Sequence, residues 1–187
     1  MTSLAAFVRF IDRVNDVIGR GVAWLTLAMV MITFVVVILR YVFSLGFVWV
    51  QESYVWLHGV VFMAGAGYTL LHEGHVRVDI FYRERGRRYR AWVDLFGSFG
   101  LLLPVIVMIW LVAWPYVLTS WSRFEESREA GGLPGLFLLK TVILVFCALV
   151  GLQGLALAGR SVLVLLGLGH LVGEETEAEA QDPAEAR

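Results

Sequence analysis

The hydrophobic positions form four long blocks, separated by short stretches that carry nearly all of the charge. Runs without Asp, Glu, Lys or Arg cover residues 21–39, 53–72, 95–122 and 141–159. The hydrocarbon core of a bilayer is about 30 Å thick, and about 20 helical residues cross it. We therefore predict an all-α membrane protein with four transmembrane helices, near residues 21–43, 49–71, 92–118 and 135–160.

Helices fit these blocks better than other structures do. Backbone polar groups find no water inside a bilayer, and barrel strands would alternate between apolar and polar residues over segments of about ten residues. Of the 187 residues, 59% are hydrophobic and only 17% are charged, whereas soluble domains carry about 25% charged residues. This composition excludes a soluble enzyme and a disordered protein. The net charge of −1 excludes a nucleic-acid binder, and the single Cys147 excludes a disulfide framework.

Basic residues are distributed unevenly between the two sides of a four-span topology. Eleven lie on one side: Arg9, Arg13, Arg20, Arg77, Arg83, Arg85, Arg87, Arg88, Arg90, Arg160 and Arg187. Four lie on the other side: Arg40, Arg123, Arg128 and Lys140. Because cytoplasmic loops carry the excess of Lys and Arg, both termini and the loop between the second and third spans are predicted to be cytoplasmic.

The first 20 residues differ from the span that follows them. Apolar residues recur there at helical spacing, and the opposite face is charged. We expect residues 1–20 to form an amphipathic helix that lies in the cytoplasmic interface before it turns into the first span; the alternative is that it packs on another protein. The four-helix transmembrane domain then covers residues 21–168. Residues 169–187 are expected to form an acidic, disordered tail.

Polar residues within or beside the spans are the candidates for function. Glu52 lies about one turn inside the second span and is expected to pair with Arg40, with a partner protein or with headgroup water. Lys140 lies near the start of the fourth span and is expected to extend toward the outer interface. Pro104 is expected to kink the third span. His58 and His72 share a helix face, but a haem between two histidines also needs histidines on a facing helix.

No motif of an enzyme or of a self-sufficient transporter is found in the sequence. It contains no nucleophile–base pair, metal-ligand cluster or glycine-rich phosphate loop. It also shows no inverted repeat with broken helices around a shared site. We therefore expect a non-enzymatic accessory subunit without a cofactor. Two alternatives stay open: the anchor subunit of a haem or quinone redox complex, and an independent small channel or exporter.

The second span and the loop after it carry three short motifs. Gln51-Glu52 opens the span, Phe62, Gly65 and Ala66 form an F-x-x-G-A segment, and His75, Val78 and Asp79 follow in an H-V-R-V-D stretch that includes Arg77. This pattern resembles the small permease (DctQ-type) subunit of the tripartite ATP-independent periplasmic (TRAP) transporters. Many relatives have two adjacent glutamates where this chain has Gln51-Glu52. Farther along, Gly132, Pro134 and Lys140 belong to a segment that resembles the mannitol/chloroaromatic-like subgroup.

The resemblance implies a scaffold role in the bacterial inner membrane. In such a symporter, a periplasmic substrate-binding protein delivers an organic acid to a large permease subunit, which contains the substrate and ion sites. The small subunit would pair with the large one and anchor it among the membrane lipids.

The loop between the second and third spans is expected to have two structural roles. His75 and Asp79 are four residues apart and would meet on one helical face, which would fix the turn. The arginines that follow are expected to contact anionic lipid headgroups: Arg83, Arg85, Arg87, Arg88 and Arg90. The loop between the third and fourth spans would face the periplasm, where it either contacts the binding protein or is simply solvated.

Overall fold

The computed structural model describes residues 2–75 and 86–172, and every regular element in these ranges is helical. The elements are α1 (Thr2–Tyr41), α2 (Val48–Leu71), α3 (Arg87–Gly97), the π-helical turn η2 (Ser98–Leu102), α4 (Leu103–Ser122), α5 (Leu136–Leu165) and the 3₁₀ turn η3 (Gly169–Val172). Within these ranges, four helical segments are long and apolar enough to cross a membrane, with α3, η2 and α4 forming one of them. The prediction of four spanning helices is therefore confirmed.

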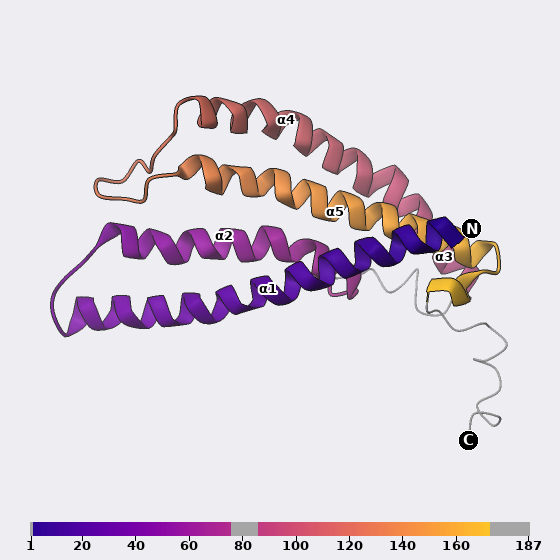
Figure 1. Ribbon diagram of the computed structural model, residues 1–187, viewed down its shortest axis with the longest axis horizontal. Helices are drawn as coiled ribbons and strands as arrows, with labels where there is room; N and C mark the ends of the chain where they lie inside the picture. The colour runs from indigo at the N-terminus through magenta and orange to yellow at the C-terminus, as the bar shows by residue number, and fades with distance from the viewer. Residues whose placement is uncertain (1, 76–85, 173–187) are drawn as a thin grey trace, which may run out of the picture.

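The long helices lie side by side in one layer, in the order α4, α5, α2, α1 (Figure 1). Helix α5 packs on both α2 and α4 and has the largest set of buried residues. A single layer leaves large apolar side chains uncovered, among them Trp24, Phe62 and Val112, which are 72%, 68% and 71% exposed. Apolar surface on this scale is not stable in water, so these faces are suited to contact lipid or another membrane protein.

Helix α1 is a single helix of 40 residues. The structure does not support the expected separate amphipathic helix over residues 1–20 with a turn before the first span. Because α1 is longer than α2, its N-terminal half passes the end of α2 and packs on α5 (Figure 1). Val8 and Ile11 are buried there in a cluster with Ala156. Helix α5 thus covers part of the apolar face of residues 1–20, and no turn at residue 20 is needed to bury that face.

The third span changes from α-helical to π-helical geometry for one turn, just before Pro104. Pro104 is the second residue of α4, and the π-helical turn Ser98–Leu102 directly precedes that helix. A proline has no N–H to donate to the carbonyl four residues earlier, and π-helical turns are one way in which helices take up such an interruption. The π-helical turn lies directly before Pro104, and the expected kink of the third span stays a prediction. On the facing side, a Cβ added to Gly154 would lie 2.6 Å from Leu102 Cδ2, so this glycine allows the close contact of α5 with the third span.

Candidate functional site

The carboxylate of Glu52 holds the loop that joins α4 to α5. Glu52 lies near the start of α2, and it accepts hydrogen bonds from the Ser127 hydroxyl and from the backbone N–H of Leu133, the latter at 2.6 Å. Ser127 and Leu133 also join each other directly, because the Ser127 N–H donates to the Leu133 carbonyl at 3.2 Å. Of the three partners considered for Glu52, Arg40 forms no ion pair with it in the described residues. The loop residues come within reach of Glu52 instead, because the layered packing places this loop over the start of α2.

Gly132 is required by the close approach of this loop to Glu52. A Cβ added at position 132 would lie 2.6 Å from Glu52 Oε2 and 2.6 Å from Ser127 Oγ. Any side chain there would therefore displace the carboxylate or the hydroxyl. The structure thus brings together Glu52 and Gly132, two motif residues that are far apart in the sequence.

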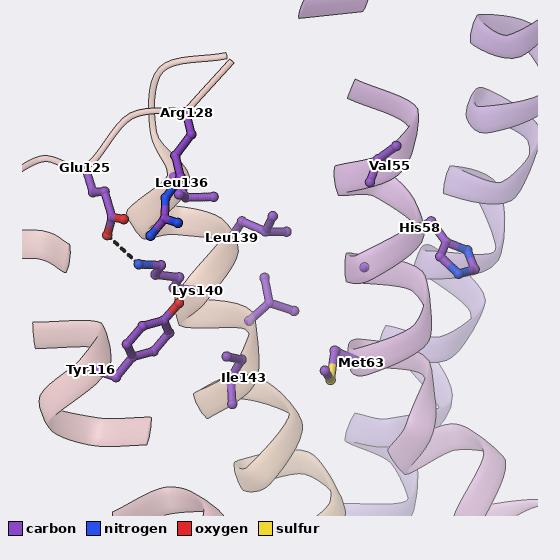
Figure 2. Close-up of a pocket in the computed structure, with 12 residues that line it drawn as sticks. Val55, His58, Met63, Tyr116, Glu125, Arg128, Leu136, Leu139, Lys140 and Ile143 are labelled. Carbon is purple, nitrogen blue, oxygen red and sulfur yellow. Dashed lines mark hydrogen bonds and ion pairs between the residues drawn. The ribbon is translucent and has the colours of Figure 1, made fainter. Parts of the chain in front are cut away.

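A second contact ties the same loop to the first turns of α5. The Lys140 ammonium donates to the Glu125 carboxylate (Figure 2). The same carboxylate also accepts a hydrogen bond from the Ser120 hydroxyl at 2.7 Å. Lys140 lies over the ring of Tyr116, 4.1 Å from its centroid. Its side chain is only 11% exposed. Lys140 is thus paired with a carboxylate of the α4–α5 loop, and its extension toward the outer interface stays a prediction.

The Lys140 ammonium also changes the acidity of Glu125. Its hydrogen bond is the main reason that the pKa of the Glu125 carboxyl falls below the ordinary value of 4.5, and the hydrogen bond from Ser120 is the second. Partial desolvation opposes the shift, and the nearby charge of Arg128 adds slightly to it. Glu125 is therefore ionised at neutral pH and provides a fixed counter-charge for Lys140.

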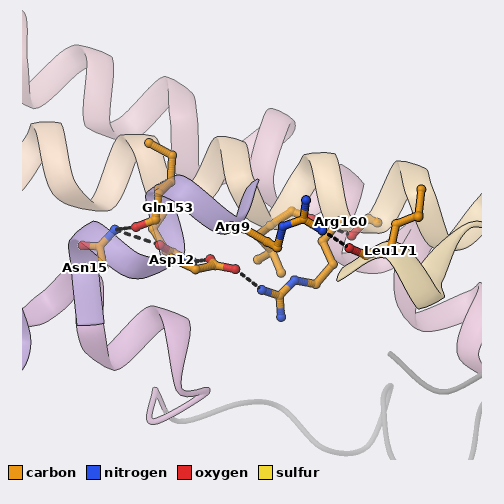
Figure 3. A network of polar contacts seen from close by, with 9 residues as sticks. Arg9, Asp12, Asn15, Gln153, Arg160 and Leu171 are labelled. Atoms are coloured by element: carbon orange, nitrogen blue, oxygen red, sulfur yellow. Dashed lines mark hydrogen bonds and ion pairs between the residues drawn. The ribbon is translucent and has the colours of Figure 1, made fainter. Parts of the chain in front are cut away.

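At the other end of the layer, a chain of hydrogen bonds joins α1 to α5 (Figure 3). Asn15 Nδ2 donates to Gln153 Oε1 at 2.8 Å, and Gln153 Nε2 donates to Asp12 Oδ1 at 2.9 Å. Arg160 Nη2 donates to Asp12 Oδ2 at 2.6 Å. Asn15 and Gln153 are 1% and 3% exposed. Because unpaired polar groups are costly in apolar surroundings, this chain fixes how the two helices lie against each other.

The residues of the F-x-x-G-A segment point in different directions. Phe62 is exposed, and a Cβ added at Gly65 would meet no atom within 4 Å, so both lie on an open face of α2. Ala66 packs instead against the buried cluster of Ile106, Cys147 and Val150 between α4 and α5. The segment therefore serves internal packing through Ala66, while Phe62 and Gly65 are available to another molecule.

The loop after α2 is only partly described. His75 is exposed, and Arg77, Val78, Asp79, Arg83 and Arg85 lie outside the described residues, so the expected contact of His75 with Asp79 stays a prediction. Arg87, Arg88 and Arg90 begin α3, with Arg88 and Arg90 exposed. Pro134 is exposed in the loop before α5. At the end of α2, the His72 ring packs against that of Tyr68, with 4.2 Å between the ring centroids and a tilt of 48° between the rings, and its Nε2 lies 3.3 Å from Asp16 Oδ1.

For several residues, these contacts were not predicted from the sequence. They are Ser127 and Tyr116 at the loop end, and Asn15, Gln153 and Arg160 at the other end. Asn15 and Gln153 carried a usable signal, since an amide within an otherwise apolar helix face needs a partner. Ser127 carried none, because serine is ordinary in a loop. In the described part of the chain, no three His, Cys, Asp or Glu residues form a group that could hold a metal ion.

These features define a class of protein. Four helices are suited to cross a membrane, and the polar side chains described above hold helices and loops of the same chain in place. Residues 29–163 match the family described as tripartite ATP-independent periplasmic transporters, DctQ component, and the chain belongs to this family. This is a family of transporter subunits and not of enzymes. Its members are small membrane proteins that work with a large permease and a substrate-binding protein. No curated protein and no solved structure matches the chain significantly.

Proposed function

We propose that this chain is the scaffold subunit of a symporter that imports an organic acid across the bacterial inner membrane. In this proposal it forms a 1:1 complex with a large permease subunit, which a periplasmic binding protein supplies with substrate. We also assign it to the mannitol/chloroaromatic-like subgroup, on the segment that contains Gly132, Pro134 and Lys140. The observation that carries the proposal is the single layer of helices in a chain of this family.

The layer is a shape suited to a scaffold. A one-helix-thick layer has two broad faces, so one face can pack on a larger membrane protein while the other contacts lipid. The exposed apolar side chains on α1, α2 and α4 supply such surface. The polar contacts at the two ends hold the layer together internally, which leaves the faces apolar. A static subunit that broadens a larger neighbour needs both properties.

The arrangement of charges supports an orientation with both termini in the cytoplasm. The N-terminal half of α1, helix α3 and the C-terminal end of α5 lie at the same end of the layer (Figure 1). The arginines of these segments therefore gather there, and the positive-inside rule places this end in the cytoplasm. The opposite end of the layer, where Glu52 holds the α4–α5 loop (the Glu52 loop end), would then face the periplasm, where the binding protein arrives.

Co-expression with the large permease subunit tests the pairing. We expect a stable 1:1 complex on gel filtration in detergent. In proteoliposomes supplied with the binding protein, uptake of the organic acid should require both membrane subunits, and vesicles with this chain alone should show no flux. Separate elution of the two subunits, or full uptake without this chain, would contradict the proposal.

Cysteine labelling tests the orientation independently. Cys147 is buried and can be replaced by alanine, after which a single cysteine is introduced as Ser3→Cys or Glu126→Cys. A membrane-impermeant maleimide added to intact cells or spheroplasts should label the Glu126→Cys variant only. Labelling of Ser3→Cys under the same conditions would refute the orientation. Optical spectra of the purified chain distinguish the haem-anchor alternative, which requires a Soret band.

A further inference from the structure

A cavity of about 620 Å³ lies over α5, between α2 and α4, at the Glu52 loop end of the layer. Figure 2 shows its two walls: Val55 and Met63 come from α2, and Leu136, Leu139 and Ile143 come from α5. Its lining runs from Val55 to Met63 along α2 and from Leu136 to Ile143 along α5, which is about 10–12 Å at a rise of about 1.5 Å per residue. Most of this lining is apolar. Because the helices form a single layer, the cavity opens on a face of that layer.

The Lys, Arg and Glu side chains of the cavity gather at the end near the α4–α5 loop, and their charges do not balance. Lys140 and Arg128 line the cavity together with one carboxylate, that of Glu125. Glu125 is already engaged by Lys140 and Ser120. In the described ranges 2–75 and 86–172, no carboxylate forms an ion pair with Arg128, although Glu125 is close enough to feel its charge. Glu126 and Glu129 belong to the same loop but do not line the cavity. Among the described residues, the guanidinium at the mouth of this apolar space therefore has no carboxylate in ion-pair contact.

We propose that this cavity binds one membrane phospholipid, with the phosphodiester at Arg128 and an acyl chain against the apolar walls. A guanidinium recognises phosphate through paired N–H donors, which suits the unmatched charge. The walls of Val55, Met63, Leu139 and Ile143 offer nothing to a hydrated ion but match a hydrocarbon chain. The volume lies within the range of ordinary ligand pockets. A free phosphate would use only the mouth of the cavity and leave its apolar length unfilled.

Native mass spectrometry of the delipidated full-length chain tests the site. The probes are phosphatidylglycerol, the diacylglycerol with the same acyl chains, and inorganic phosphate as competitor. We expect one phosphatidylglycerol per chain, bound about tenfold more tightly than diacylglycerol, and no displacement by phosphate at the same concentration. Replacing Arg128 with Gln should remove this tenfold preference, which corresponds to about 1.4 kcal/mol.

A second variant tests the apolar part of the site separately. Gly59 lines the cavity, and its nearest neighbour for an added Cβ is Leu139 Cδ1 at 3.4 Å. Gly59→Phe should fill the space and weaken both lipids alike, and Val55→Trp serves the same purpose if the first variant does not fold. Arg40→Gln is the matched control, since Arg40 lies at the same end of the layer without lining this cavity.

Four results would overturn the proposal. One is equal binding of phosphatidylglycerol by the Arg128→Gln and Arg40→Gln variants, and another is unchanged binding after the cavity is filled. Displacement of the lipid by inorganic phosphate at similar concentration would identify a free anion as the ligand. Loss of the lipid when the large permease subunit binds would identify that protein as the occupant of the cavity.

Discussion

Replacing Glu52 with Ala tests how strongly the start of α2 holds the α4–α5 loop. The wild-type carboxylate accepts from the Ser127 hydroxyl and from the Leu133 N–H, and Ala removes both contacts. Hydrogen bonds to charged groups contribute about 1.5–3 kcal/mol each. Because Glu52 is only partly buried, the lower value applies to each bond. The variant should therefore lose about 3 kcal/mol of local stability in this loop.

Hydrogen exchange of the Leu133 amide measures this loss directly. The amide exchanges only when the loop opens, so its rate reports the free energy of that local opening. A loss of about 3 kcal/mol corresponds to roughly 100-fold faster exchange. Glu52→Gln keeps a carbonyl that can accept from Leu133 but loses the charge, and a neutral hydrogen bond is about half as strong. We expect about tenfold faster exchange for Glu52→Gln.

Glu126→Ala is the matched control for these variants. Glu126 is an exposed acid of the same loop, and its removal changes the loop charge by the same amount. Its Leu133 exchange should stay at the wild-type rate. Exchange that is unchanged in Glu52→Ala, or accelerated equally in Glu126→Ala, would show that the loop is not held by the carboxylate contacts.

Two further predictions concern packing and pH. A Cβ added at Gly67 would lie 2.0 Å from Asn15 Oδ1, whereas one added at Gly65 would meet no atom within 4 Å. Gly67→Ala should therefore lower the thermal unfolding midpoint in detergent by several degrees, and Gly65→Ala should not. Equal midpoints of the two variants would refute the close contact at Gly67. The lowered pKa of Glu125 stabilises the loop fully above its ordinary value of 4.5, and this contribution is lost as the pH falls through the lowered pKa. Exchange of the Glu125 amide, corrected for its intrinsic rate, should therefore accelerate below about pH 4.5. The Glu125→Gln variant should show no such pH dependence. If the wild-type chain also showed none, the contact between Glu125 and Lys140 would not stabilise the loop.

The positions of the spans could be predicted because hydrophobicity is a local property. The second span was expected at residues 49–71 and is observed as Val48–Leu71. The third was expected near residues 92–118, around the charge-free run 95–122. The helix nevertheless begins at Arg87. Charged residues mark where a helix leaves the hydrocarbon core of the bilayer. They do not mark where the helical backbone ends.

The first helix shows the limit of pattern analysis. Residues 1–20 have an apolar and a charged face on a helix, as the pattern predicted. Such a pattern agrees equally with a helix in the lipid interface and with one packed on protein. The structure places Val8 and Ile11 against α5, and Asp12 in an ion pair with Arg160. Periodicity shows that a helix has an apolar side. It does not show which surface covers that side.

The sequence by itself determined that this is a membrane protein of four helices with an arginine-rich end, because hydrophobic length and charge need no knowledge of distant contacts. Only the tertiary structure decided the partners of the polar residues. Glu52 meets Ser127 and Leu133 because the layer places the α4–α5 loop over the start of α2, and Lys140 meets Glu125 because that loop folds back on α5. Such pairings join residues that are far apart along the chain, so they depend on how the helices pack.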